Sequence, residues 1–437
     1  MTIGLARILL GATLVVGSIG ALAQTNRIDI VRHDAPELAH FGDYAIGVRT
    51  LELVDPHRAD ILRSTEMGQT IYYDRSLIVE VWYPATLADG QQPGEVYSST
   101  TRNPAITASL QGRAVRDAIA ANRDKSVPLV IISHGYPGNR YLMSHMGENL
   151  ASKGYVVASI DHRDSTYEDQ QSFWSTLYNR PLDQLFVLEQ MAAMSADTDS
   201  FLYGVVDAGR TGVVGYSMGG YGLIVNLGGG YSDAVVKSEG APPGRLAARF
   251  AATNPDFKTH RDPRIKAGFA VAPWGMARGV WDFSALHNIT TPVFFLSGSL
   301  DTTAGYEDGT RAIFENAISS DRYLLTYINA GHNAIAPIPL PFEIQMSKDT
   351  TGASHYTDPV WDSVRSANIM NHFATAFFDV YLKGNADRIT YLELVPHAQD
   401  GVYDIVDAQP TQEHSYWKGF AEGTAHGLIL EHLPVAK

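Results

Sequence analysis

Residues 211–222 read Thr211-Gly212-Val213-Val214-Gly215-Tyr216-Ser217-Met218-Gly219-Gly220-Tyr221-Gly222, and we expect the rest of the chain to be arranged around them. Its apolar run leads into the G-x-S-x-G pattern of a sharp turn between a strand and a helix. Such a turn strains the backbone of its serine, so glycines flank it. We expect Ser217 to stand above a sheet at a helix N-terminus, where negative charge is favoured. The alternative is a glycine-rich turn with an ordinary serine, and residues elsewhere in the chain decide between the two.

Apolar runs on both sides of this turn alternate with helical segments. We expect strands over residues 127–133, 155–160, 212–215, 265–272, 292–297 and 323–328, and helices over 141–153 and 182–194. Near-continuous apolar strands are typical of a parallel sheet that is covered on both faces. Right-handed crossovers then give a doubly wound, mostly parallel α/β sheet, in which ligands bind beyond the carboxyl ends of the strands.

The rest of the chain adds to this sheet within one domain over residues 24–437. Strands are expected over 44–54 and 77–84, a helix that could cover the site over 104–122, and an amphipathic helix over 358–383. Residues 232–263 and 333–357 do not fit the alternation, and we interpret them as lid or rim insertions; surface decoration is the alternative. Residues 390–437 form a C-terminal tail that we expect to pack back on the domain.

Two later residues can activate the serine. A serine hydroxyl becomes a nucleophile when a histidine takes its proton and a carboxylate orients that histidine. Asp301 follows the strand expected over residues 292–297, and His332 follows the strand expected over residues 323–328. We therefore expect Ser217, Asp301 and His332 to meet at one edge of the sheet as a catalytic triad. The alternatives are a solvated loop aspartate and a surface histidine, with Asp308 and Glu307 as fallback acids.

The loop after the first buried strand, residues 133–138, reads Ser-His-Gly-Tyr-Pro-Gly. Attack on an ester builds negative charge on the carbonyl oxygen, which two preorganised backbone N–H groups can hold. Met218 follows the nucleophile and offers one N–H group, and Tyr136 is the best position for the other. We interpret His134 as a residue that orients this loop.

Two aromatic residues are candidates for contacts with substrate. Trp274 follows the strand next to that of the serine, and Tyr216 precedes the serine. Aromatic side chains at such positions are more often part of the core, and that alternative stays open. The chain has no cysteine and no histidine or carboxylate pattern with metal spacing, so we propose no metal and no cofactor.

The composition and the N-terminal residues indicate which partners the protein has and where in or outside the cell it is located. The formal net charge of −14, without a basic cluster, argues against nucleic acid as a partner. Residues 1–23 predict a secretory signal, with Arg7, an apolar stretch too short to span a membrane, and the cleavage pattern Ala21-Leu22-Ala23. An uncleaved anchor is the alternative. We expect a periplasmic or secreted protein without stable membrane insertion after cleavage.

Further motifs carry a resemblance to a known family. They are His134-Gly135, the run Asn149-Leu150-Ala151-Ser152-Lys153-Gly154-Tyr155-Val156-Val157-Ala158, and Asp161-His162-Arg163-Asp164-Ser165. Together with the serine turn, Asp301 and Gly331-His332, they resemble the platelet-activating-factor acetylhydrolase (plasma type) and dienelactone-hydrolase-like branch of the α/β-hydrolases. We interpret His162, Arg163 and Asp164 as a structural ion-pair turn near the site.

This resemblance implies an α/β-hydrolase fold and cofactor-free hydrolysis of carboxylic esters, often with short acyl groups. It implies the roles proposed above for Ser217, Asp301 and His332, with Tyr136 and Met218 as oxyanion donors. Dienelactone hydrolases proper use a cysteine nucleophile, so their specific activity is not implied.

The sequence as a whole predicts an exported serine esterase that works on a small ester through an acyl-enzyme. One alternative is a depolymerase for polyesters or plant-wall acyl groups. A second is a lipase with the proline-rich residues 335–342 as its lid. A third is a catalytically silent α/β-hydrolase scaffold used for binding.

Overall fold

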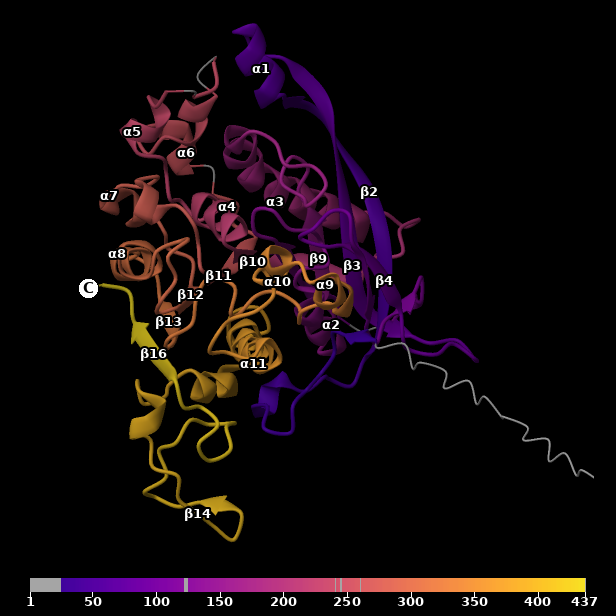
Figure 1. Cartoon of the computed structure of the whole chain (residues 1–437), viewed down its shortest axis with the longest axis vertical. Coiled ribbons are helices and arrows are strands. Elements are labelled where there is room, and N and C mark those ends of the chain that lie inside the picture. The colour runs from indigo at the N-terminus through magenta and orange to yellow at the C-terminus, as the bar shows by residue number, and fades with distance from the viewer. Residues whose placement is uncertain (1–24, 122–124, 240, 244–245, 260, 437) are drawn as a thin grey trace, which may run out of the picture.

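A sheet of eleven strands runs through the molecule (Figure 1). The computed structural model describes residues 25–121, 125–239, 241–243, 246–259 and 261–436. In spatial order the strands are β16 (Leu428–Leu433), β13 (Arg322–Tyr327), β12 (Val293–Gly298), β11 (Ile265–Val271), β10 (Val206–Tyr216), β8 (Val127–Ser133), β9 (Val156–Asp161), β3 (Tyr72–Thr86), β2 (Ala45–Ala59) and β6 (Val115–Arg116), and β7 (Ile119–Ala120) pairs with β3. Strands β8 to β13 are parallel, whereas β3 and β16 run antiparallel to β9 and β13.

Helices cover both faces of this sheet. α2 (Ser144–Ser152) and α11 (Ser363–Tyr381) pack on one face, and α3 (Phe173–Ala196) and α4 (Met218–Asn226) pack on the other. The shorter helices are α1 (Ile61–Met67), α5 (Asp233–Val236), α6 (Pro255–Thr259), α7 (Phe283–Leu286), α8 (Ala312–Asn316), α9 (Phe342–Ser347) and α10 (Thr350–Ala353). The remaining turns are the π-helical η4 (Tyr306–Arg311) and the 3₁₀ turns η1 (Glu37–Ala39), η2 (Ala247–Phe250), η3 (Met276–Arg278), η5 (Ala386–Tyr391) and η6 (Ala398–Asp400).

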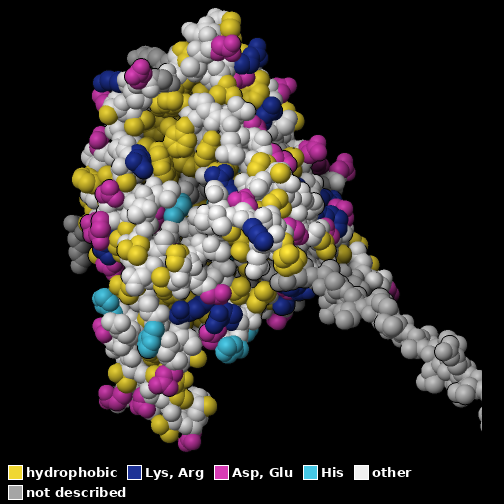
Figure 2. All heavy atoms as spheres, in the orientation of Figure 1, with side chains coloured by type: hydrophobic (Ala, Val, Ile, Leu, Met, Phe, Trp, Pro, Cys, Tyr) yellow, Lys and Arg dark blue, Asp and Glu magenta, His cyan; other side chains and the backbone are white. Residues whose placement is uncertain are grey.

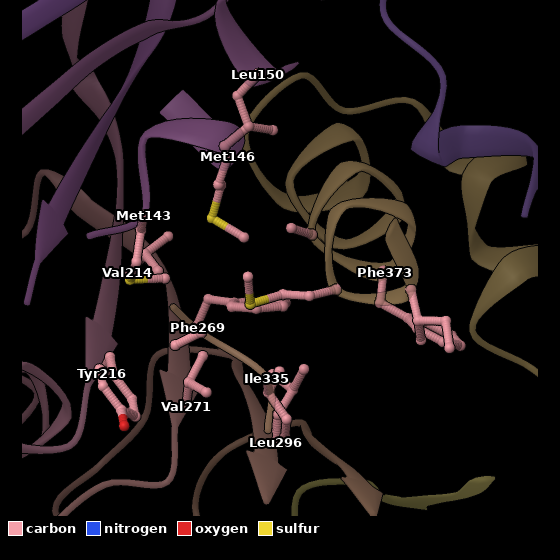
Figure 3. Packing of buried hydrophobic residues seen from close by; sticks show 14 of the residues in the cluster. Met143, Met146, Leu150, Val214, Tyr216, Phe269, Val271, Leu296, Ile335 and Phe373 are labelled. Carbon is pink, nitrogen blue, oxygen red and sulfur yellow. The ribbon is translucent and has the colours of Figure 1, made fainter. Parts of the chain in front are cut away.

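Each face of the sheet closes over its own apolar cluster, because successive side chains of a strand point to opposite faces. In β10, Val214 belongs to the cluster under α2 and α11, and Val213 belongs to the cluster under α3 and α4. Figure 3 shows part of the first cluster, with Met146 of α2 facing Phe269 of β11 and Phe373 of α11 lying further along the same layer. Burying a side chain of this size contributes about 1.5–3 kcal/mol to the free energy of unfolding.

Most of the expected elements are confirmed. The strands expected over 127–133, 155–160, 265–272, 292–297 and 323–328 match β8, β9, β11, β12 and β13 to within one residue at each end. The strand that leads into the serine is longer than expected and begins at Val206. The expected α/β sheet, mostly parallel and doubly wound, is thus observed.

The helix expected over 104–122 is wrong. This segment instead contains β5 (Thr107–Gln111), β6 and β7. In β5 the residues Ala108 and Leu110 are buried, while Thr107 and Ser109 are exposed. That period of two is typical of a strand, and β5 pairs with β4 (Val96–Thr100) and β1 (Asn26–Arg27) in a small separate sheet.

The helix expected over 182–194 begins earlier, at Phe173, and continues through Pro181. A proline has no backbone N–H, so Leu177 O loses its usual partner within the helix. The hydroxyls of Tyr221 and Tyr231 donate to this carbonyl at 2.8 and 3.2 Å. This replacement also joins α3 to α4, the helix that follows the serine.

Two projections extend from the sheet (Figure 1). The β2–β3 hairpin carries α1 at its tip, and the C-terminal segment with the hairpin of β14 (Ile405–Val406) and β15 (Gln409–Pro410) projects at the opposite end. The end of the tail packs back as expected, because its last strand, β16, pairs with β13. On the face drawn in Figure 2, hydrophobic side chains gather in a hollow over the region of α4, α6 and α7.

The two segments that do not fit the alternation form short helices. Residues 232–263 contain α5, η2 and α6, and residues 333–357 contain α9 and α10. The second segment lies against α2, where Ile338 N donates to Leu142 O and His145 Nε2 lies 2.9 Å from Ala336 O. In the described ranges no helix is both long and apolar enough to cross a membrane. The signal expected over residues 1–23 lies outside the described residues.

Candidate active site

Ser217 occupies a strained turn between β10 and α4. Its φ of 51° lies in the left-handed region, which is uncommon for a residue with a side chain. The backbone holds this conformation from both sides, because Ser217 N donates to Val271 O at 2.9 Å and Ser217 O accepts from Trp274 N at 3.1 Å. The side chain thus stands at the first turn of α4, at the carboxyl edge of the parallel strands.

Gly219 permits this turn by close approach. A Cβ atom at this position would lie 1.9 Å from Ser133 O, a backbone atom that cannot move aside alone. We expect Gly219→Ala to lower the free energy of unfolding by at least about 1–3 kcal/mol, measured by chemical denaturation.

Gly209→Ala is the matched control for this replacement, because its Cβ would meet only the side chain of Asp207, at 3.0 Å. Equal stability losses in the two variants would contradict this account of Gly219.

His332 and Asp301 lie next to the serine. His332 Nε2 lies 3.0 Å from Ser217 Oγ, and His332 Nδ1 lies 2.8 Å from Asp301 Oδ2. The other carboxylate oxygen of Asp301 accepts from the backbone N–H groups of Thr303 and Ala304 at 2.9 and 3.0 Å. The carboxylate is fully buried, and the imidazole is 11% exposed. The structure therefore brings the three residues into one hydrogen-bonded chain.

The fallback acids do not take this place. Glu307 and Asp308 are exposed on η4, where Glu307 lies 3.6 Å from Arg311. The carboxylate that faces His332 belongs to Asp301.

Met218 follows Ser217 directly as the first residue of α4, and Tyr136 lies in the loop after β8. The loop of Tyr136 packs against the serine closely, since a Cβ on Gly135 would lie 3.4 Å from Ser217 Cβ. Among the described residues, neither Tyr136 N nor Met218 N donates a hydrogen bond within the chain. In the described part of the chain the fold therefore leaves both N–H groups without an acceptor, as the expected oxyanion donors require.

Buried polar side chains hold the loop of residues 134–138 from behind. His134 Nε2 accepts from His162 N at 3.2 Å, so Nδ1 carries the proton and donates to Gly135 O at 2.7 Å. The expectation that His134 orients this loop is confirmed. His162 contacts Ser133 Oγ at 2.8 Å and Asp183 Oδ2 at 3.0 Å, and burial lowers its pKa to about 3. It is therefore neutral at pH 7.

The expected ion-pair turn is confirmed for Asp164. His162 is neutral and takes part through hydrogen bonds, and the Arg163 guanidinium lies 5.8 Å from the ring centroid of Tyr73. Asp164 pairs with Arg75 at 2.8 Å, and Asp183 pairs with both Arg58 and Arg75 at 2.9 Å. Although burial opposes it, the charge of Arg75 holds the pKa of Asp183 well below its usual range.

Sequence reasoning missed Asp183 and Arg180. Both side chains lie on α3, far along the chain from the loop they support, and a polar residue in a helix carries no signal of such a role.

Aromatic side chains form a wall beside the serine. The ring of Phe173 packs edge-on against Trp274 at 4.9 Å and against Tyr136 at 5.8 Å between centroids. Phe173 is 38% exposed, and the other two are half-buried, so the wall faces solvent in part. We call Tyr136, Phe173 and Trp274 the aromatic wall.

Tyr216 has a different environment. It is 1% exposed, its ring lies 5.3 Å from that of His332, and its hydroxyl donates to Asn333 Oδ1 at 2.7 Å. These contacts favour the alternative of a core residue that supports His332. The described residues contain no group of three or more His, Asp or Glu side chains that could hold a metal ion.

The sheet order and the serine turn define an α/β-hydrolase fold. In agreement, the structure of a ferulic acid esterase from Streptomyces cinnamoneus matches 80% of this chain and 94% of its own, with a TM-score of 0.54 and 21% identity. At that identity the likeness shows the fold alone.

Sequence comparisons show similarity to particular ester hydrolases as well as to the fold. The model of the PET hydrolase-like family matches residues 114–230. Cutinase est1 from Thermobifida alba is 28% identical over 206 residues, which are 47% of this chain and 53% of the cutinase. A bis(hydroxyethyl) terephthalate hydrolase from Streptomyces coelicolor is 26% identical over 48% of this chain and 51% of its own length. The chain thus spans about half the length of these relatives.

These matches support the resemblance at the level of the α/β-hydrolase superfamily and of ester hydrolases. They do not confirm the platelet-activating-factor acetylhydrolase and dienelactone-hydrolase-like branch.

Proposed function

We propose that this chain is a serine carboxylic ester hydrolase that works through an acyl-enzyme on Ser217. The observation that carries the proposal is the hydrogen-bonded chain from Ser217 Oγ through His332 to Asp301, at 3.0 and 2.8 Å. A catalytically silent binding scaffold would need neither this hydrogen-bonded chain nor, beside it, the N–H groups of Tyr136 and Met218, which lack an acceptor among the described residues.

Each group has a defined part in the proposed reaction. His332 Nε2 takes the proton as Ser217 Oγ attacks the ester carbonyl, and the buried Asp301 stabilises the imidazolium. The N–H groups of Tyr136 and Met218 hold the oxyanion, each contributing about 3 kcal/mol to the transition state. His332 then protonates the leaving alcohol, and a water molecule, activated in the same way, releases the acid.

Covalent labelling tests this proposal. A fluorophosphonate should label the folded wild-type protein once per chain, with the label at Ser217, and the protein should hydrolyse p-nitrophenyl acetate. Folded protein that takes up no label and hydrolyses no ester would leave the proposal without support.

For the substrate, we propose esters with an aromatic acyl group, as in aromatic polyesters or plant-wall esters. This departs from the short-acyl ester favoured by the resemblance. The aromatic wall offers ring faces and edges beside Ser217, and ring pairs contribute about 0.5–1.5 kcal/mol beyond their burial. The names of the relatives, among them a terephthalate ester hydrolase, support the same class.

Trp274→Ala tests whether the aromatic wall binds an aromatic acyl group, because it removes the ring that packs against Phe173. We expect kcat/KM for an aryl ester such as ethyl benzoate to fall by about 3- to 10-fold, because a ring contact is lost. The value for ethyl acetate should change much less, and Trp274→Phe should keep most of the aromatic preference. Equal losses for both esters would argue that Trp274 only supports the fold.

We further propose that residues 1–23 direct export and that residues 24–437 form one domain. In this proposal residues 333–357 form a rim of the site, because Asn333 links Tyr216 to Ser354 through two hydrogen bonds of 2.7 and 3.0 Å. Residues 232–263 would form a second rim beyond α4.

A further inference from the structure

Arg180 lies behind the loop that carries Tyr136. It is 1% exposed, on α3, and its guanidinium points at backbone carbonyls. Nη1 donates to His134 O, and Nη2 donates to Gly135 O at 3.0 Å and to Ser165 Oγ at 2.7 Å. Gly135 O thus accepts from two side chains, Arg180 and His134.

The carbonyl of Gly135 and the N–H of Tyr136 belong to the same peptide group. Donors that hold the oxygen of this group fix its plane, and therefore fix the direction of its N–H. A charged donor on the oxygen also draws electron density from the nitrogen, which makes the N–H a stronger donor. We infer that Arg180 is a positioning residue for ester hydrolysis, which holds and polarises the Gly135–Tyr136 peptide so that Tyr136 N–H stabilises the oxyanion. This inference rests on the proposed function.

The charge of Arg180 is not cancelled by a direct ion pair. In the part of the chain that the structure describes, no carboxylate lies within ion-pair distance of it. Burial lowers the pKa of Arg180 to about 9. The nearby charge of Asp183 raises this pKa, and the charge of Arg75 lowers it further. The guanidinium is therefore charged at neutral pH. Because the dielectric of a buried site is low, such a charge acts over a longer distance there than in solvent.

α3 supports the other side of the oxyanion site as well. Gln184 follows Arg180 by four residues and so lies on the same face of the helix. Its Nε2 donates to Gly219 O at 3.0 Å, in the first turn of α4, next to Met218. Tyr221 of α4 donates to Leu177 O of α3. One helix therefore contacts both segments that carry the expected oxyanion donors.

The test compares Arg180→Gln and Arg180→Lys with wild type. We expect Arg180→Gln to lower kcat for p-nitrophenyl acetate by about 10- to 100-fold while KM changes much less, because an oxyanion donor acts in the transition state. The affinity for phenylboronic acid, which forms a tetrahedral adduct with Ser217, should fall by a similar factor. Arg180→Lys keeps the charge and should recover part of both losses.

Arg322 provides the matched control, because it is also a buried arginine that donates to backbone carbonyls. It is 4% exposed at the start of β13 and donates to Ser320 O and Pro434 O at 3.1 Å. Arg322→Gln and Arg322→Lys should lower the melting temperature but leave kcat and boronate affinity near wild type.

The inference is overturned if folded Arg180 variants keep wild-type kcat and boronate affinity, or lose them no more than the Arg322 variants. If Arg180→Gln does not fold, the pair Arg180→Lys and Arg322→Lys decides alone. A wild-type protein that neither hydrolyses esters nor takes up fluorophosphonate would instead contradict the proposed function.

Discussion

Replacing Ser217 by alanine is expected to lower kcat for p-nitrophenyl acetate by about 10⁶-fold, because the group that forms the acyl-enzyme is lost. The fold should persist, since alanine fits the same backbone conformation and only the hydroxyl, with its 3.0 Å contact to His332, disappears. The rate is measured together with the melting temperature, which should stay close to that of wild type.

Ser133 provides a matched control, because it also contacts a histidine that contacts an aspartate. Its Oγ lies 2.8 Å from His162, which lies 3.0 Å from Asp183, but it is fully buried. Fluorophosphonate should therefore still label Ser133→Ala and should not label Ser217→Ala. Undiminished labelling and turnover in Ser217→Ala would contradict the proposed nucleophile.

Asp301→Asn should have the second largest effect and lower kcat by about 10⁴-fold. The backbone N–H groups of Thr303 and Ala304 keep one oxygen of this side chain in place. An asparagine would therefore turn its amide nitrogen toward His332 Nδ1 and favour the wrong tautomer. The imidazolium would also lose its buried counter-charge.

The control for this replacement is Asp308→Asn, which changes an exposed carboxylate a few residues further along the chain. We expect nearly wild-type kcat in that variant. If the two variants lost the same activity, Asp301 would have no special part in the reaction.

Local patterns carried most of the prediction of fold and site. Buried strands such as β8 and β12 are short apolar runs whose ends are marked by small residues, so their bounds match within one residue. Asp301 and His332 were found because each follows such a strand. The helix expected over 104–122 is wrong because β5 is short and half-buried, and its pairing with β1 and β4 is not local.

The contacts of α3 could not be read from the sequence. Proline disfavours a helix interior, so the residues before Pro181, including Arg180, carry a weak helix signal. The helix continues there because hydroxyls of Tyr221 and Tyr231 satisfy the carbonyl that the proline leaves free. Those partners lie 44 and 54 residues away along the chain.

The alternation of strands and helices, the serine turn, and the three residues expected to form the triad follow from local sequence patterns. These features depend on hydrophobic periodicity and on the glycines that flank Ser217 in the chain. The charges behind the loop of Tyr136, the rings beside Ser217 and the pairing of β5 depend instead on how distant segments pack together. The physical reason is that buried polar groups need partners, and in this protein the folded chain supplies them from distant segments.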